Sequence, residues 1–317
     1  MNITASKMEG TCAEDKVEKV DKCHIHHNYS GINKPGTDCP YCWQLHLSKN
    51  PIKKYLGEDG IVGRQIRLNQ VKLKVAPGSD YAEVLFFGDL HYGHPQCNLI
   101  KAKGYLDHAL ANNIYVICMG DLLECGLTTS IGDSVYQQDL NPQEQMEEVV
   151  DLLRPLAEKG LILGIHAGNH ENRITKATSI DVTKIMAKML GVKYLGYACW
   201  NMFWVGGQKY SMYSTHGSGG SRYKHTKLKT AMDLAQWIDA DVIAMGHLHA
   251  LGTETMIKQG VDFRNRQVKD SECQIVLTGS FMDWDKSYAQ MMNMPITKLG
   301  APQMKLWASH STVEVTI

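Results

Sequence analysis

The chain has 317 residues, 44% of them hydrophobic, and its 33 basic and 33 acidic side chains give a formal net charge of zero. This composition is typical of a globular protein and excludes a disordered chain. No stretch approaches the roughly 20 apolar residues that a membrane helix needs, and the polar start of the chain has no apolar signal core. We therefore expect a soluble, cytoplasmic protein with no membrane partner.

Residues 1–60 are predicted to form a small module with a linker, and residues 61–317 a large domain. Four of the nine cysteines fall within the first 42 residues. In a chain without a secretory signal, such a cluster indicates a metal site before disulfides. A C-x-x-H pair and a C-x-x-C pair suit a tetrahedral structural zinc. The candidate zinc ligands are Cys23, His26, Cys39 and Cys42, with His24, His27 and His46 as alternates.

The front part also has other interpretations. A disordered, cysteine-rich tail is the simplest alternative to a zinc module. The sequence CPYC matches a redox motif as well, but no strand precedes it, as a thioredoxin-like fold requires. Residues 49–75 carry seven Lys or Arg against two acidic residues. This run suits either a nucleic-acid backbone or a solvated strand face.

Beyond the front part, the hydrophobic pattern alternates between strands and helices. Residues 64–75 alternate apolar and polar, which predicts a strand with a bulge at Asn69 and Gln70. Further strands are predicted at 83–88, 114–120, 161–167, 209–217 and 241–247, and helices at 95–112, 142–159, 180–190 and 226–238. Asn141 and Glu144 have the spacing of a capping box. Because 254–317 is mostly strand-like, we expect a layered α/β fold with helices on both faces.

Five predicted strands run into polar clusters. The clusters contain Asp89 and His91 in GDLH, Asp121 in GDLLE, Asn169 and His170 in GNHE, His216 in STHG, and His247 and His249 in GHLH. In open α/β sheets, ligands bind at the carboxyl ends of strands, so these clusters converge if the sheet is continuous. Two residues apart on an extended segment, the side chains of Asp89 and His91 would point to the same side, as would those of His247 and His249.

The residue types indicate a transition-metal site. Mixed imidazole and carboxylate ligands suit Mn, Fe, Zn or Ni and not calcium. A single GD or HxH is usually a turn, and a lone histidine such as His216 is usually structural. Unrelated turns and structural histidines would not be expected to give five such clusters in this order, each after an apolar run, so we interpret them together as one site.

Over residues 80–280 these motifs resemble those of the calcineurin-like metallophosphoesterase superfamily. The segments GDSVYQQDLNPQEQ, THGSGG and SYAQMMNMPITKLGAPQMKLW are similar to phage and prophage metallophosphoesterases, which would place the protein in a host cytoplasm. The resemblance implies a two-sheet αββα sandwich and two divalent metal ions. It implies that Asp89, His91 and His249 hold one metal, that Asn169, His216 and His247 hold the other, and that Asp121 bridges both.

The resemblance also implies roles for neighbouring residues. A hydroxide shared by the two metals would attack phosphorus in line. His170 would stabilise the transition state or protonate the leaving oxygen without binding metal. Glu171 would orient a ligand histidine, with a solvated loop acid as the alternative. His94 and Arg173 are candidate substrate contacts, and a surface position is the alternative for Arg173.

The second motif bears on the substrate. Glu124 stands in GDLLECG where the Ser/Thr phosphatases have an arginine nearby and the double-strand-break repair nucleases a histidine. This departure weakens a phosphoprotein interpretation and also matches that nuclease subclass poorly. The favoured expectation is a phosphodiesterase or nuclease whose substrate is nucleic acid or a nucleotide. The alternatives are a phosphomonoesterase on a small phosphate or phosphoprotein, and a non-catalytic binding protein braced by metal. A basic run, SRYKHTKLK (221–229), opens a helix near the site; the oligomeric state stays open.

Overall fold

The chain divides into two compact units, Met1–Gln65 and Ile66–Ile317. The structure, a computed structural model, describes residues 22, 23, 25–30, 32, 35, 39–49, 67–76, 78–128, 130, 134–285, 288–291 and 293–317. Cys12, the alternate ligand His24 and residues 50–66 of the first basic run lie outside the described residues. Among the helices of the described part, none is long and apolar enough to cross a membrane.

Among the described residues of the first unit, the buried apolar cluster is small. One helix is described in this unit, α1 (Pro40–Lys49). Its core consists of Cys23, Cys42 and Leu45, with Tyr29 and Cys39 packed against them. So few apolar side chains bury little surface, and modules of this size usually need a metal or disulfides to be stable.

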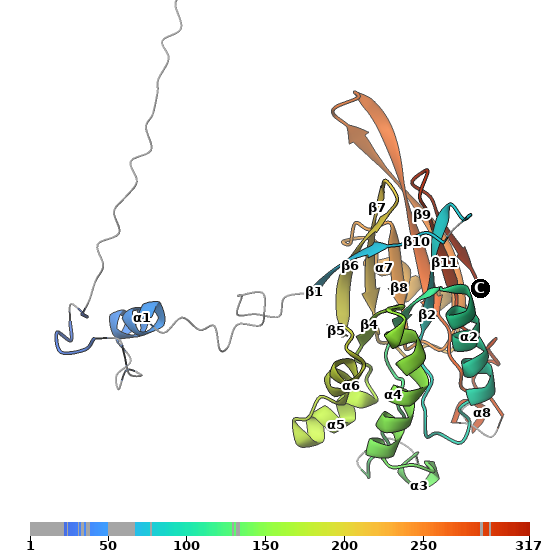
Figure 1. The fold of residues 1–317 in the computed structure, drawn as a ribbon, viewed down its shortest axis with the longest axis horizontal. Coiled ribbons are helices and arrows are strands. Elements are labelled where there is room, and N and C mark those ends of the chain that lie inside the picture. The colour runs from blue at the N-terminus through green and yellow to red at the C-terminus, as the bar shows by residue number, and fades with distance from the viewer. Residues whose placement is uncertain are drawn as a thin grey trace, which may run out of the picture. The chain divides into compact units, whose positions relative to one another are not determined.

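The second unit is built on two six-stranded sheets (Figure 1). The first sheet has the order β12-β11-β2-β3-β4-β5. Its strands are β2 (Tyr81–Phe87), β3 (Tyr115–Cys118), β4 (Ile162–His166), β5 (Tyr194–Gly196), β11 (Gln303–Trp307) and β12 (Val313–Thr316). Strands β2 to β5 are parallel, and β11 joins β2 in the antiparallel direction. The carboxyl ends of β2, β3 and β4 therefore lie at the same edge.

The second sheet has the order β1-β6-β7-β8-β10-β9. Its strands are β1 (Arg67–Leu73), β6 (Ala198–Val205), β7 (Gln208–Thr215), β8 (Val242–Met245), β9 (Leu251–Asp262) and β10 (Gln267–Thr278). Strand β8 is parallel to both β7 and β10. The β9–β10 hairpin extends beyond its neighbours (Figure 1). The bulge predicted at Asn69 and Gln70 is wrong, because β1 pairs with β6 in unbroken register.

Helices connect the strands. They are α2 (Leu99–Asn112), α3 (Ser134–Gln137), α4 (Pro142–Glu158), α5 (Glu171–Thr178), α6 (Val182–Leu190), α7 (Lys224–Leu234) and α8 (Tyr288–Met291). The capping box predicted for α4 is present, with Asn141 and Glu144 each accepting the other's backbone N–H. Helix α2 begins later than predicted because Asn98 caps it through the backbone N–H of Lys101.

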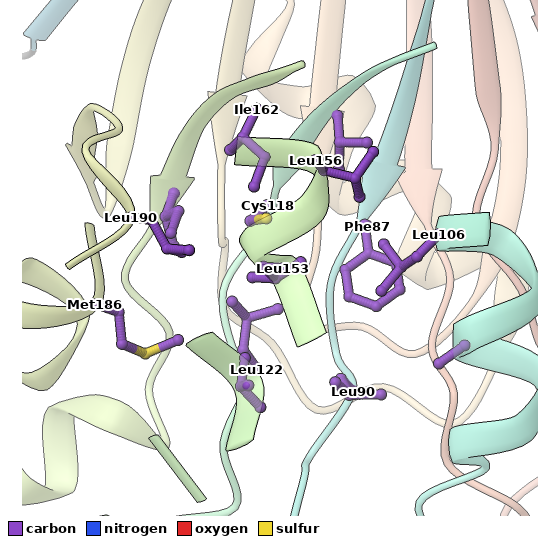
Figure 2. Close-up of a cluster of buried hydrophobic side chains, with 14 of the residues drawn as sticks. Phe87, Leu90, Leu106, Cys118, Leu122, Leu153, Leu156, Ile162, Met186 and Leu190 are labelled. Carbon is purple, nitrogen blue, oxygen red and sulfur yellow. The ribbon is translucent and has the colours of Figure 1, made fainter. Parts of the chain in front are cut away.

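Helices α2, α4 and α6 cover one face of the first sheet. Figure 2 shows their side chains meeting those of the strands. The labelled contacts comprise Leu106 of α2, Leu153 and Leu156 of α4, Met186 and Leu190 of α6, and Phe87, Cys118 and Ile162 of the strands. All of these residues are buried, so this layer forms a continuous core beneath the site.

The other face of the first sheet packs on the second sheet. Phe86 follows the strand alternation and points away from Phe87, into a core shared with Phe203 and Met212. Beyond the second sheet, Ala231 of α7 packs in a third core. The αββα order of layers expected from the sequence is confirmed. The polar strand ends belong to two packed sheets and not to one continuous sheet, because β7 and β8 lie in the second.

Candidate dinuclear metal centre

The predicted ligands lie on tight backbone turns. Asp89, His91, Asp121, His247 and His249 all have positive φ, between 47° and 64°. The expectation that these pairs lie on extended segments is therefore wrong. A left-handed conformation costs a residue with a Cβ on the order of 1 kcal/mol, so surrounding contacts must hold each turn.

Two of these turns hold each other. The backbone N–H groups of Leu90 and His91 both donate to the carbonyl of Asp121, at 2.9 and 3.0 Å. The N–H of Asp89 donates to the carbonyl of Gly120 at 3.0 Å. The ends of β2 and β3 thus continue side by side, which fixes the positions of three predicted ligands.

Two histidines are oriented by backbone carbonyls on their outer side. His216 donates from Nδ1 to the carbonyl of Met119 at 2.8 Å, and His247 donates from Nε2 to the carbonyl of Gly219 at 3.1 Å. A neutral imidazole carries a single proton, so the other ring nitrogen of each histidine has a free lone pair. This outer hydrogen bond is typical of histidines that bind metal.

One group of ligands forms at the end of β2. The Nε2 atoms of His91 and His249 lie 3.0 Å apart, and the Nε2 of His249 is 3.3 Å from Oδ1 of Asp89. Such close nitrogen and oxygen lone pairs repel unless a proton or a cation lies among them. Asp89, His91 and His249 are within the reach of one metal ion.

A second group forms around the end of β7. Oδ2 of Asp121 lies 3.3 Å from Nε2 of His216, which in turn is 2.9 Å from Oδ1 of Asn169. Asp121, His216 and His247 are within the reach of one metal ion. Oδ2 of Asp121 is also 3.9 Å from Nε2 of His91, so this carboxylate faces both groups. All seven predicted ligands therefore come together, and Asp121 lies between the two sets.

Three buried atoms of this centre have no hydrogen-bond partner: Asp89 Oδ1, Asp121 Oδ2 and His247 Nδ1. Buried polar atoms without partners are costly, on the order of 1–3 kcal/mol each, and are rare in folded proteins. Here they face one another across the two groups. The donor set of carboxylate oxygen, imidazole nitrogen and amide oxygen fits two divalent cations.

The pKa values of the histidines differ according to their surroundings. Burial lowers the pKa of His91 to about 4. For His216, burial also lowers the pKa, but the adjacent Asp121 carboxylate outweighs it and raises the pKa to about 10. A cation bound at Asp121 would compete with that proton, because both need the same lone pair on Nε2.

Glu124 is a site residue that sequence reasoning missed. It is buried, and its Oε2 lies 3.1 Å from Nδ1 of His91 and 3.2 Å from Nδ1 of His170. Burial raises its pKa, but hydrogen bonds from these two histidines hold the pKa well below the usual range of a glutamate. Its position three residues after Asp121 is the signal that the sequence offers for this role.

His170 lies at the rim of the centre. Its backbone N–H donates to Oδ1 of Asp121 at 2.9 Å, and its Nδ1 donates to the carbonyl of Glu124 at 2.9 Å. Nε2 of His170 is 3.9 Å from Oδ2 of Asp121. Burial lowers the pKa of His170, but Asp121 and Glu124 together raise it above its usual value. His170 is thus held beside the metal ligands, with its Nε2 toward them.

The two candidate substrate contacts lie around His170. Arg173 donates to Nε2 of His170 at 3.0 Å and forms an ion pair with Glu124 at 3.3 Å. Its side chain is 23% exposed, so it is not a free surface arginine. His94 is partly buried and accepts the N–H of Gln96 at 3.2 Å. A substrate contact by either residue remains a prediction.

Glu171 has a role that neither interpretation of the sequence anticipated. It is buried and accepts four backbone N–H groups, from Asp121, Leu122, Leu123 and Gly168, at 2.7–3.2 Å. Burial, followed by the Asp121 carboxylate, raises its pKa to about 7, and the N–H bonds oppose this shift. Glu171 is neither a solvated acid nor bound to a ligand histidine. It holds the turn that positions Asp121.

The first unit brings the four candidate zinc ligands together. Their ligand atoms all lie within 4.8 Å of one another. Sγ of Cys23 is 4.0 Å from Sγ of Cys39 and 4.0 Å from Nδ1 of His26, which is 3.3 Å from Sγ of Cys42. Burial raises the pKa of Cys23, but the N–H groups of His26 and Ile25 outweigh it and lower the pKa to about 6, which favours a thiolate. The cluster fits one divalent cation.

Among protein families, curated proteins and solved structures, only solved structures are similar to this chain. No family model and no curated protein matches the sequence. Three similar solved structures each align with 74% of this chain. They are a predicted phosphoesterase from Streptococcus pneumoniae (13% identity, TM-score 0.31, 97% of that chain), zinc-complexed Vps29 from Entamoeba histolytica (14%, 0.30, 97%) and a metallophosphoesterase from Sphaerobacter thermophilus (15%, 0.33, 86%). These identities and scores are too low to transfer a function, which has to come from the side chains of this chain.

Gly168 provides a test of how the Asp121 turn is held. A Cβ at this position would lie 2.1 Å from both the backbone nitrogen and Oδ1 of Asp121. Gly168→Ala should therefore displace Asp121 and abolish binding of at least one of the two metal ions, as measured by elemental analysis of the purified protein. Gly104→Ala is the matched control, because a Cβ there meets nothing within 4 Å. Unchanged metal content in Gly168→Ala would contradict the described packing.

Proposed function

We propose that this protein is a metal-dependent phosphoester hydrolase with two divalent cations at the centre described above. The observation that carries the proposal is the set of buried, unpartnered ligand atoms on Asp89, Asp121 and His247. They come from both sheets and face one another, together with oriented histidines. Mixed oxygen and nitrogen ligands around two adjacent cations are typical of phosphoester hydrolysis.

Different residues of the chain would hold the metal ions, orient the ligands and transfer a proton. When bound, two divalent cations supply Lewis acidity that activates a water and offsets charge on the phosphate. Asp121 keeps the two ligand groups together, and Glu171 holds its turn. Nε2 of His170 lies beside the ligands. When the ring is protonated and Arg173 has left this nitrogen, Nε2 can donate a proton to the leaving oxygen. Glu124 fixes the ring at Nδ1, and Arg173 contacts the ring at Nε2 itself.

The favoured substrate is a phosphodiester of nucleic acid or a nucleotide. A phosphomonoester carries more negative charge and is commonly clamped by free arginines. Arg173 is the arginine next to His170, and its charge is already compensated by Glu124. This arrangement supports a diester over a monoester. The similarity of segments such as THGSGG to phage-type enzymes supports a phage or prophage origin.

Hydrolysis of bis(p-nitrophenyl) phosphate with Mn²⁺ tests the proposal. The wild-type protein should release nitrophenol, and Asp121→Asn should lower kcat/KM at least about a hundredfold because it weakens both ligand groups. Asp107→Asn, on the exposed face of α2, is the control with the same chemical change and should have no effect. Metal binding without turnover of any phosphoester would support the non-catalytic alternative. Turnover of monoesters alone would support a phosphomonoesterase.

His170 allows catalysis to be separated from metal binding. His170→Ala should lower kcat by about 10²–10⁴, the range for loss of a general acid. Two equivalents of metal should stay bound, because all seven proposed ligands are intact. His108→Ala, an exposed histidine on α2, serves as the control. Full activity of His170→Ala would exclude the proposed role. Loss of one metal equivalent would instead make His170 a ligand.

We further propose that the cluster of the first unit binds a structural zinc ion. Two buried cysteines, a third cysteine and His26 supply a thiolate-rich set that suits zinc. The small core of this unit supports the proposal, because metal binding can supply the folding free energy that so few apolar side chains do not.

Substitution of one cysteine tests the zinc site. Cys42→Ser should lower the zinc content by one equivalent and unfold the first unit, as seen by proteolysis of that unit. Hydrolysis of bis(p-nitrophenyl) phosphate should stay unchanged, since the dinuclear centre lies in the second unit. Cys97→Ser, a partly buried cysteine of the second unit, is the control. Equal zinc content in Cys42→Ser and the wild type would contradict the site.

A further inference from the structure

A cavity of about 230 Å³ lies where the chain leaves the metal centre. Leu251, two residues after His249, forms part of its wall. Four basic residues line it, Arg222, Lys224, Lys227 and Lys298, and no acidic side chain does. None of the proposed roles uses this cavity, and its lining includes three of the four Lys and Arg residues of the run 221–229.

The positive charge of the cavity is largely uncompensated. Among the described residues, Arg222, Lys224 and Lys227 form no ion pair with a carboxylate, whereas Lys298 lies 3.4 Å from an oxygen of the terminal carboxylate of Ile317, which also lines the cavity. Lys229 on the same helix contrasts with them, because it is paired with Asp233 at 2.6 Å. Like charges gathered without counter-charges repel, and an anion bound among them relieves that repulsion.

One hydrogen bond and one longer-range electrostatic interaction link the cavity with the metal centre. Lys227 lies close enough to Asp89 for that carboxylate to raise its pKa, although burial prevails and lowers it. The loop before Arg222 also touches the centre, because the carbonyl of Gly219 accepts the hydrogen bond from His247. An anionic group in the cavity would therefore be a neighbour of a phosphate at the metals.

The cavity also has an apolar side. Among its lining residues, Leu251 is buried and Ile296 is 72% exposed. A free inorganic anion gains nothing from contact with an apolar surface, whereas the sugar or base attached to a phosphate can pack against it. Charge and apolar surface together match a nucleotide unit.

We propose that this cavity binds the phosphate next to the one that is cleaved, so that the substrate is a nucleic-acid strand extending beyond the scissile phosphodiester. This inference rests on the proposed phosphoesterase function and specifies its substrate class. The first basic run is a weaker candidate for the same task. Within that run, Arg67 already has partners in the protein, because it stacks over the ring of Tyr194 and donates to the Tyr194 carbonyl. It is therefore less available to bind a phosphate.

The test compares two substrates in the full-length protein with Mn²⁺: bis(p-nitrophenyl) phosphate, which has no second phosphate, and a thymidine decanucleotide. The double variant Arg222→Ala/Lys224→Ala removes two exposed charges of the cavity. The ratio of kcat/KM for the strand to kcat/KM for the small diester should fall about tenfold at low salt. The dependence of log kcat/KM on log salt concentration should become shallower by about 1.4 for the strand, as expected for two lost phosphate contacts.

Two controls keep the result specific. Lys101→Ala/Lys103→Ala removes the same charge from an exposed part of α2 and should leave the ratio unchanged. The charge-preserving variant Arg222→Lys/Lys224→Arg should restore most of the strand preference. Binding of a labelled decanucleotide without metal, followed by fluorescence anisotropy, reports on the cavity even if no substrate is cleaved.

The outcomes separate the two proposals. If the wild type cleaves no phosphoester, the proposed function fails, and weaker decanucleotide binding by the double variant still supports a phosphate-binding cavity. If the small diester is cleaved and the double variant leaves the ratio and the binding unchanged, the cavity proposal is overturned. A loss confined to nucleoside triphosphates, with strands unaffected, would overturn the assignment to a strand and make the ligand a free nucleotide.

Discussion

The centre of this molecule depends on the repulsion among ligand atoms that the fold brings together away from water. Two ring nitrogens 3.0 Å apart and two buried carboxylate oxygens without partners cannot be stable side by side as free lone pairs. A proton on His216 relieves part of this repulsion, and divalent cations bound among the lone pairs would relieve all of it. The fold therefore holds these atoms in an unfavourable arrangement that metal binding would relieve. Rigid surroundings are needed to keep the atoms in place.

Those surroundings are backbone contacts as much as side-chain contacts. Asp121 sits in a left-handed turn whose three N–H groups, from Asp121, Leu122 and Leu123, bond to the buried Glu171. Gly168 packs so closely against this turn that no side chain fits there. The turn of His91 is fastened to the carbonyl of Asp121. Because both sheets contribute such ends, the packing of the two sheets on each other sets the distances between ligands, and the buried core between them is part of the site.

Hydrogen bonding also distinguishes ligand histidines from structural ones. His166 is buried and has both ring nitrogens satisfied, one by the carbonyl of Gly196 at 2.9 Å and the other by Ser214 at 2.7 Å. In His247 only the outer nitrogen is satisfied, by the carbonyl of Gly219. His216 also meets a carbonyl with its outer nitrogen, but its Nε2 faces Oδ1 of Asn169 and Oδ2 of Asp121, which are themselves predicted to bind metal. Within the same sheet sandwich, one histidine thus links neighbouring strands by hydrogen bonds, while others direct a ring nitrogen toward the predicted metal centre. Burial alone does not separate these roles, whereas the partners of the inner nitrogen do.

The sequence by itself indicated the polar clusters that contain the seven predicted ligands, the capping box of α4 and the layered α/β fold, because these depend on local patterns: polar residues after apolar runs, helix caps and hydrophobic periodicity. The αββα order and the assignment of the seven ligands came from the family resemblance of those motifs. Tertiary structure alone decided the rest. The left-handed turns at Asp89 and His247 leave no mark in composition. The role of Glu124 arises from its contact with His170, 46 residues away in the chain, and Glu171 serves β3 from the start of α5. The basic cavity joins α7 to a segment near Lys298. Such pairings form only when distant segments pack, so no local pattern encodes them.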